Sequence, residues 1–145
     1  MFLEIKKKYR GLVNKRRTTL ELGEAYDFIE TGVKPELQDY MNGQVLNELE
    51  YCLNLYDLEP KVYIAYDRLA YFEKGNDDLR ISFDTNIRTR RSDLLLESGD
   101  HGKRLLDSDV WLMEIKTSLA KPLWLCQMLS EFEIRSSSFS KYGTE

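Results

Sequence analysis

Two neighbouring segments decide the fold of this chain: "KVYIAYDRLAYF" (residues 61–72) and "LRISFDTNI" (residues 79–87). Both are rich in β-branched and aromatic residues, which favour β-strands. The link between them, "EKGNDD" (73–78), is rich in turn-forming residues, so the two segments predict a β-hairpin. Side chains alternate between the two faces of a strand. The hairpin therefore has one apolar face and one charged face, and the charged face carries Arg68, Arg80, Ser82, Asp84 and Asn86.

The same division into an apolar and a charged face recurs in the other predicted strands. "FLEIKKKYRGLVNKRRTTL" (2–20) predicts two strands joined near Arg10-Gly11, and "VWLMEIKTS" (110–118) predicts the last strand. Their charged faces carry Glu4, Lys6 and Lys8, then Lys15 and Arg17, and finally Glu114 and Lys116. Such faces either lie in water, as in many antiparallel sheets, or line a tunnel that must hold an anion to offset the repulsion between cations. The recurrence in all five strands modestly favours the tunnel.

Helical spacing of apolar residues appears between and after the strands. It predicts helices in "GEAYDFIETG" (23–32), in residues 36–56, as one helix or a pair broken near Asn42-Gly43, and in "PLWLCQMLSEF" (122–132). The segment "TRRSDLLLESGDHGK" (89–103) predicts an irregular excursion. We find no linker or repeat, so we expect one α+β domain over residues 1–145, with an antiparallel sheet flanked by helices.

Composition excludes several classes of protein. With 42% hydrophobic and 32% charged residues the chain should fold, and no run of eighteen apolar residues predicts a transmembrane helix. Lys6 to Lys8 interrupt any secretory signal at the start. Cys52 and Cys126 lack metal-ligand spacing and are expected to be reduced. We therefore expect a cytoplasmic protein without a membrane segment.

Charge is unevenly distributed along the chain. Residues 1–17 carry seven Lys or Arg against one Glu, whereas residues 21–59 carry ten Asp or Glu against one Lys. A basic front could bind nucleic acid, but the acidic middle would repel a long polyanion lying across the surface. We expect no nucleic-acid partner, and a small or threaded anion instead.

Six segments, in order along the chain, resemble the vacuolar transporter chaperone (VTC) domain of polyphosphate polymerases, a family of triphosphate tunnel metalloenzymes. They are "FLEIKKKYRGLVNKRR" (2–17), "KVYIAYDRLAYF" (61–72), "DLRISFDTNI" (78–87), "LMEIK" (112–116), "PLWL" (122–125) and "SSFSKYGT" (137–144). The resemblance implies a tunnel of antiparallel strands that transfers the γ-phosphate of ATP to a growing inorganic polyphosphate chain. It also implies Mn²⁺ or Mg²⁺ as cofactor.

The resemblance also implies a set of site residues. Lys6, Lys15, Arg68 and Arg80 match the family's phosphate-gripping cations, and Lys141 of "SFSKY" matches a lysine that reaches back to the tunnel. Glu114 of "MEIK" matches a metal-binding glutamate. The residues assigned to the transfer step are Lys6, Arg68, Arg80 and Lys141. Strand alternation adds Lys8, Arg17, Asp84 and Lys116 to the lining, of which the three cations are further expected phosphate ligands.

Two expectations follow from a departure from the family pattern. In the family, further strands with a lysine and an Arg-x-Arg pair precede the "FLEIKKK" strand (2–8). We therefore expect a tunnel that is incomplete at its N-terminus, which a second chain could complete, and no polyphosphate synthesis by residues 1–145 alone. Two alternatives stay open: a non-catalytic remnant that binds phosphate or polyphosphate, and a triphosphate hydrolase of the same superfamily. The "SFSKY" ending favours the polymerase.

Overall fold

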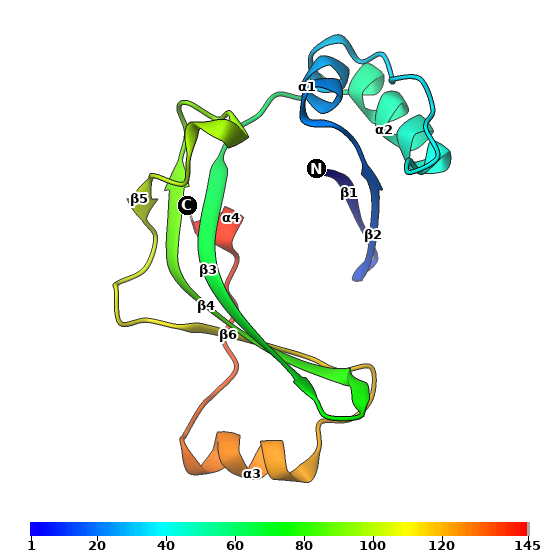
Figure 1. The fold of residues 1–145 in the computed structure, drawn as a ribbon. Coiled ribbons are helices and arrows are strands. Elements are labelled where there is room, and N and C mark those ends of the chain that lie inside the picture. Colours follow the sequence, from blue (N-terminus) through cyan, green and yellow to red (C-terminus); the bar gives the residue numbers. More distant parts are fainter. Residues whose placement is uncertain (145) are drawn as a thin grey trace. The chain divides into compact units, whose positions relative to one another are not determined.

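The computed structural model describes residues 1–144, without the side chains of residues 76 and 77. The chain forms two compact units, Met1–Glu59 and Pro60–Glu145. Figure 1 shows the elements of both units along the chain. No helix among the described residues is long and apolar enough to span a membrane.

The first unit begins with the predicted hairpin. Strand β1 (Phe2–Tyr9) pairs antiparallel with β2 (Leu12–Thr19). Arg10 and Gly11 form the turn, with φ angles of 48° and 84°. Two successive positive φ angles are typical of a type I′ turn, whose twist matches that of the flanking strands. The register places Lys6 opposite Lys15 and Glu4 opposite Arg17, so the predicted charged face is formed.

Two helices cover the apolar face of this hairpin: α1 (Leu22–Thr31) and α2 (Gly43–Leu55). Leu3 and Ile5 of β1 pack against the buried core of the unit. That core consists of Leu20, Ala25, Phe28, Met41, Val45, Leu46 and Leu49. Burial of these side chains is the main stabilising term that the unit has.

Local signals set the ends of both helices. A capping box between Glu21 and Glu24 begins α1, and Gly32, with a φ of 70°, ends it. The side chain of Asn42 accepts a hydrogen bond from the backbone N–H of Val45 at 3.1 Å and caps α2. The predicted break near Asn42-Gly43 is confirmed, but the predicted helix before it is wrong. Residues 36–41 contain only irregular and turn structure, because Met41 reaches the core from a turn.

The second unit is built on a four-stranded antiparallel sheet. Strands β3 (Tyr63–Glu73) and β4 (Asn76–Arg90) form the predicted hairpin, with Gly75 at a φ of 76° in its turn. Strands β5 (Lys103–Arg104) and β6 (Leu112–Lys116) both pair with β4. The remaining elements are the short helix η1 (Leu96–Ser98), α3 (Leu123–Glu131) and α4 (Lys141–Thr144).

Three details of this unit differ from the sequence prediction. Strand β4 continues to Arg90 and β5 forms within the predicted excursion, because Arg88 and Thr89 pair with Arg104 and Lys103. Helix α4 forms in a tail for which no helix is predicted. Among the described residues the strands make two open sheets and no closed barrel, so the tunnel stays a prediction.

A β-bulge at Asn86, whose φ is 50°, divides β4 into two parts. Before the bulge, Arg68 pairs with Asp84, Ser82 with Glu114, and Arg80 with Lys116. Since paired residues lie on the same side of a sheet, these six side chains share one face, which we call the charged face. After the bulge the alternation shifts by one residue, so Arg88 and Arg90 lie on the opposite face with Asp67.

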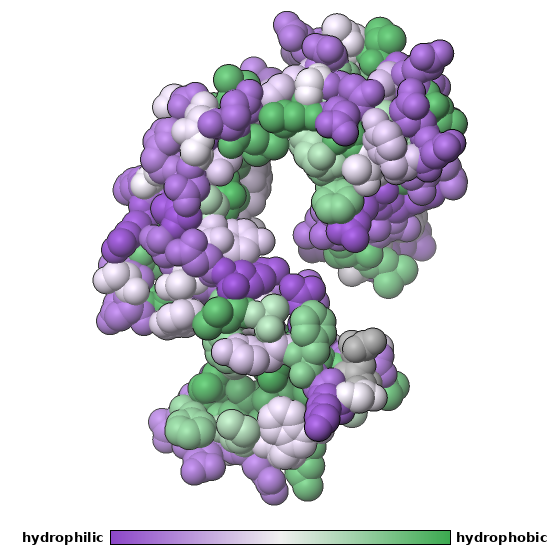
Figure 2. Space-filling view, viewed as in Figure 1, coloured by the Kyte–Doolittle hydropathy of each residue, from purple (hydrophilic) through white to green (hydrophobic). Residues whose placement is uncertain are grey.

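Helix α3 carries apolar residues around most of its circumference. Leu125 is buried, but many of its apolar neighbours are exposed, and Figure 2 shows apolar residues gathered over this helix. The exposed side chains include Leu123, Trp124, Met128 and Phe132. Met113 and Ile115 of β6 line one cavity with Leu129 of α3, which places α3 on the apolar side of the sheet.

Candidate anion site

The centre of the charged face is a buried carboxylate that binds two cations. Asp84 has an exposed fraction of 0%. Arg68 donates to both of its oxygens, from Nε to Oδ1 at 2.5 Å and from Nη2 to Oδ2 at 2.7 Å. Lys141 donates from Nζ to Oδ2 at 2.6 Å. Charge-assisted hydrogen bonds of this length, one pair of them bidentate, are the strongest that side chains make.

The hydrogen bonds between Arg68 and Asp84 shift the pKa of both of these residues. Burial alone would raise the pKa of Asp84, but the hydrogen bonds from Arg68 and Lys141, together with their positive charges, lower it below its ordinary value. The hydrogen bond to Asp84 raises the pKa of Arg68 above its ordinary value, and the nearby Tyr66 and Glu114 raise it further. The carboxylate of Asp84 is therefore ionised at neutral pH, and the guanidinium of Arg68 is charged.

Tyr66 lies under both cations. Its ring centroid is 4.9 Å from Cζ of Arg68 and 4.6 Å from Nζ of Lys141. Cations are attracted to the face of an aromatic ring, so Tyr66 helps to hold the two side chains side by side. The sequence analysis assigned no role to this residue. The sequence could have indicated this role, because Tyr66 lies two residues before Arg68 and side chains two residues apart in a strand lie on the same face.

Lys141 reaches the sheet from the start of α4. Ser137, Phe139 and Lys141 line a cavity of about 250 Å³ together with Leu112, Met113 and Glu114 of β6. The C-terminal segment 137–141 therefore lies along β6, and its lysine meets a carboxylate 57 residues earlier in the chain. This placement agrees with the predicted return of Lys141 to the sheet.

Glu114 is the open carboxylate of the face. Its Oε2 lies 3.8 Å from Nη2 of Arg68, and its Oε1 lies 3.3 Å from Nζ of Lys116. Its side chain is 44% exposed, in contrast to Asp84. Among the described residues, no three His, Cys, Asp or Glu side chains gather in one place. A divalent cation at Glu114 would therefore take most of its ligands from water or from a bound anion.

Arg80 and Lys116 form a pair of like charges directly across the strands β4 and β6. Like charges in this position repel each other. The Nε of Arg80 is buried and has no hydrogen-bond partner within the described part of the chain. The guanidinium lies 5.4 Å from the ring centroid of Phe72. An unpaired buried donor beside a second cation is an arrangement that an anion would complete.

The four remaining predicted cations lie on one face of the β1–β2 hairpin: Lys6, Lys8, Lys15 and Arg17. Lys15 forms an ion pair with Glu4 at 2.9 Å, and Arg17 lies 4.5 Å from the ring centroid of Phe2. Lys6 and Lys8 are exposed and form no ion pair with any described residue. The opposite face is different, because Lys7 and Arg16 both bind Glu48 of α2. The hairpin therefore separates exposed cations from cations that bind a helix.

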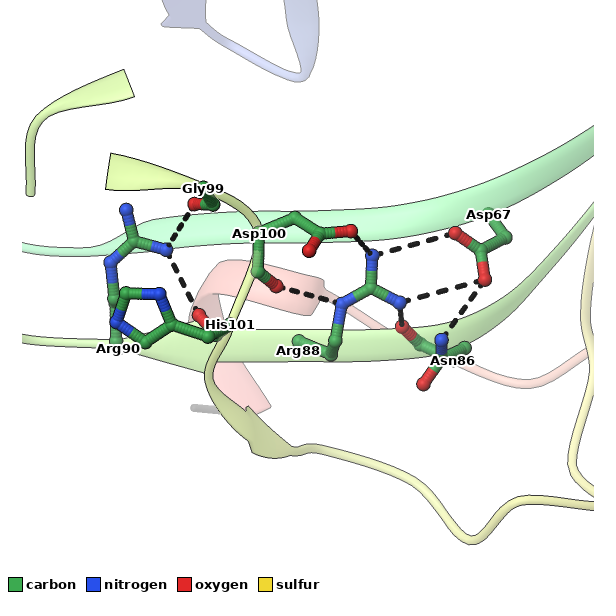
Figure 3. A network of polar contacts seen from close by, with 7 residues as sticks. All are labelled: Asp67, Asn86, Arg88, Arg90, Gly99, Asp100 and His101. Atoms are coloured by element: carbon green, nitrogen blue, oxygen red, sulfur yellow. Dashed lines mark hydrogen bonds and ion pairs between the residues drawn. The ribbon is translucent and has the colours of Figure 1, made fainter. Parts of the chain in front are cut away.

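A second polar network, which the sequence analysis missed, lies at the far end of β4 (Figure 3). Arg88 binds Asp100 at 2.7 Å and Asp67 at 3.4 Å, and Asn86 also donates to Asp67 at 3.0 Å. This network joins the bulge to the loop before β5. It could not be predicted, because the alternation of 79–86 places Arg88 on the wrong face.

Arg90 completes the attachment of that loop. Its guanidinium donates to four backbone carbonyl oxygens and lies 3.6 Å from the ring centroid of Tyr63. The four carbonyls belong to Asp93, Leu95, Gly99 and His101. With all three nitrogens bonded in this way and 8% of the residue exposed, Arg90 holds the loop and is not available to a ligand.

The chain matches the model of a known protein family. The family model described as the VTC domain matches residues 1–145, the whole chain. No curated protein matches the chain. The match covers the first hairpin, the charged face of the second unit and the segment that carries Lys141. This chain belongs to the VTC domain family.

Proposed function

We propose that this protein is a polyphosphate polymerase, which transfers the γ-phosphate of ATP to a growing polyphosphate chain in a metal-dependent basic site in the cytoplasm. The observation that carries the proposal is the charged face, where Arg68 and Lys116 lie beside one open carboxylate, Glu114, and where Arg80 and Lys141 also lie. Membership of the VTC domain family supports the same reaction class.

The cations suit phosphoryl transfer because that reaction needs positioning and charge neutralisation more than covalent help. Arg68 uses two of its five N–H donors on Asp84, and Lys141 uses one of three. The other donors of both side chains can bind phosphate oxygens, although Nη2 of Arg68 also lies 3.8 Å from Oε2 of Glu114. The guanidinium of Arg80 can donate hydrogen bonds to two phosphate oxygens at once, and the ammonium of Lys116 presents a compact positive charge.

Glu114 is the residue that would hold Mn²⁺ or Mg²⁺. Its exposure and its position among cations fit an ion bound through one carboxylate and the phosphates of the substrate, which is a common mode for Mg²⁺. When bound, such an ion neutralises charge on phosphate oxygens. Glu114 would then pair with the ion instead of with Lys116, and Lys116 would bind the phosphates instead.

In the first unit, we propose that Lys6, Lys8, Lys15 and Arg17 also bind phosphates, as the family resemblance implies. Their support is that all four extend from one face of the β1–β2 hairpin and that helices cover the other face. A second chain that adds strands to the open sheets would be a further partner. We expect ATP and polyphosphate as ligands, and no nucleic acid.

The test is synthesis from labelled ATP with Mn²⁺, followed on a polyacrylamide gel. A polymerase should produce long labelled chains that the gel resolves. In the active form, Glu114→Gln should abolish synthesis and Asp109→Asn, an exposed acidic residue elsewhere, should not. Release of inorganic phosphate without chains would overturn the polymerase in favour of a hydrolase. Binding without either product would overturn it in favour of the polyphosphate-binding remnant.

A further inference from the structure

Asp84 differs from every other acidic residue of the charged face because a ligand cannot reach it. Its exposed fraction is 0%, whereas the side chain of Glu114 is 44% exposed. Both carboxylate oxygens already accept hydrogen bonds from Arg68, and Oδ2 accepts a third from Lys141. Asp84 therefore cannot contact a phosphate or a metal ion directly, and it must act through the two cations.

The two cations bind Asp84 from different parts of the second unit. Arg68 extends from β3, the strand next to Asp84, and Lys141 extends from α4. Their side chains are 26% and 20% exposed, so each presents part of its charged group to solvent. Without the carboxylate of Asp84 between them, the positive charges of Arg68 and Lys141 would repel each other.

We propose that Asp84 is the positioning residue of the anion site: its buried carboxylate holds the guanidinium of Arg68 and the ammonium of Lys141 side by side and offsets one of their two charges. The inference rests on the proposed function, because it assumes that both cations face phosphate. Asp84 accepts hydrogen bonds from two N–H groups of Arg68 and one of Lys141, and the remaining N–H groups of both cations can bind the ligand. It also fastens the C-terminal segment 137–144 to the sheet through Lys141.

This role has a signature that a purely structural residue lacks. Replacing Asp84 with Asn removes one negative charge from between two cations while nearly preserving shape. The anion site then becomes more positive by one charge, but Arg68 and Lys141 are no longer held in fixed positions. Binding of a polyanion should therefore become tighter while phosphoryl transfer becomes slower, because transfer needs alignment and binding of a polyanion needs mainly charge. A structural lesion would weaken both.

Tripolyphosphate is the probe, titrated calorimetrically into residues 1–145 at low ionic strength. We expect Asp84→Asn to bind about fivefold more tightly than the wild type, with a steeper loss of affinity on adding salt. Asp84→Glu keeps the charge and should bind as the wild type does. The matched control is Asp67→Asn, which makes the same charge change on the opposite face of the same hairpin and should change affinity less than twofold.

The outcomes separate this inference from the proposed function. If the wild type does not bind tripolyphosphate, the anion site itself is contradicted, and this inference with it. If the wild type binds but folded Asp84→Asn binds equally or more weakly, only the role of Asp84 is overturned. In whichever form makes polyphosphate, Asp84→Asn should lower both KM and kcat, and a raised KM would also contradict the inference.

A measurement on the wild type covers the case in which the Asn variant does not fold. Lys141 is paired with Asp84 and 20% exposed, whereas Lys116 is 60% exposed. Acylation by an amine-reactive reagent, mapped by mass spectrometry, should therefore modify Lys141 about tenfold more slowly than Lys116. Equal rates at the two lysines would contradict the pairing on which the proposal depends.

Discussion

At the scale of single residues, Asp84 makes the stability of the second unit depend on pH. Its pKa is lowered in the folded protein because, although burial opposes ionisation, Arg68 and Lys141 bind the ionised form. In the unfolded chain the pKa of an Asp is about 3.9. Because the pKa of Asp84 is lower in the folded protein, its contribution to stability is complete above the unfolded pKa and is lost as the pH falls through the folded pKa.

The first prediction at this scale concerns acid unfolding. At pH 7 Asp84→Asn should lower the free energy of unfolding by about 3 kcal/mol, because it removes one partner of a buried ionic cluster. The difference between variant and wild type should shrink as the pH falls below about 4. Urea unfolding between pH 7 and pH 3 measures this. A difference that stays constant over that range would contradict the assignment, and Asp57→Asn, an exposed residue, should show no difference at any pH.

At the scale of elements, strand alternation predicts faces only as far as the backbone remains regular. Residues 79–85 alternate regularly, so the face that carries Arg80 and Asp84 is predicted correctly. The positive φ of Asn86 then inserts a bulge, and Arg88 moves to the other face. Nothing in the local pattern shows this, because Asn is compatible with both a regular strand and a bulge.

Burial of Asp84 and the missing helix at 36–41 could not be predicted for related reasons. Asp84 is buried partly by Lys141, a contact across 57 residues that no local spacing reveals. Residues 36–41 carry apolar side chains at helical spacing, yet only Met41 among them is buried. Among the helices that were predicted correctly, α1 and α2 carry capping signals at their ends as well as apolar spacing.

The prediction at the element scale tests the start of α2. Asn42→Ala removes the side-chain acceptor of the Val45 N–H and should cost about 1 kcal/mol in the free energy of unfolding. Asn42→Asp keeps an acceptor and adds a negative charge near the helix N-terminus, so it should cost nothing or stabilise. Chemical denaturation measures both. Asn14→Ala, at an exposed position on β2, is the control, and an equal loss there would show that the cap is unimportant.

At the scale of the whole molecule, net charge does not explain an affinity for polyphosphate. The formal net charge is −4, and the second unit carries thirteen Lys or Arg against fourteen Asp or Glu. Binding of a polyanion must therefore depend on where cations gather, which is the charged face of the four-stranded sheet and the open face of the β1–β2 hairpin. An anion site of this kind should lose affinity at high salt, because exposed charges are screened.

The most direct test of the central claim compares two arginines on opposite faces of the same sheet. Arg80 lies on the charged face, whereas Arg104 pairs with Arg88 and lies exposed on the other face. Calorimetric titration with tripolyphosphate should show that Arg80→Gln weakens binding about tenfold or more, since it removes charge-assisted hydrogen bonds to the ligand. Arg104→Gln, with the same change of charge, should bind as the wild type does. Equal affinity of Arg80→Gln and wild type, or an equal loss in both variants, would contradict an anion site on this face.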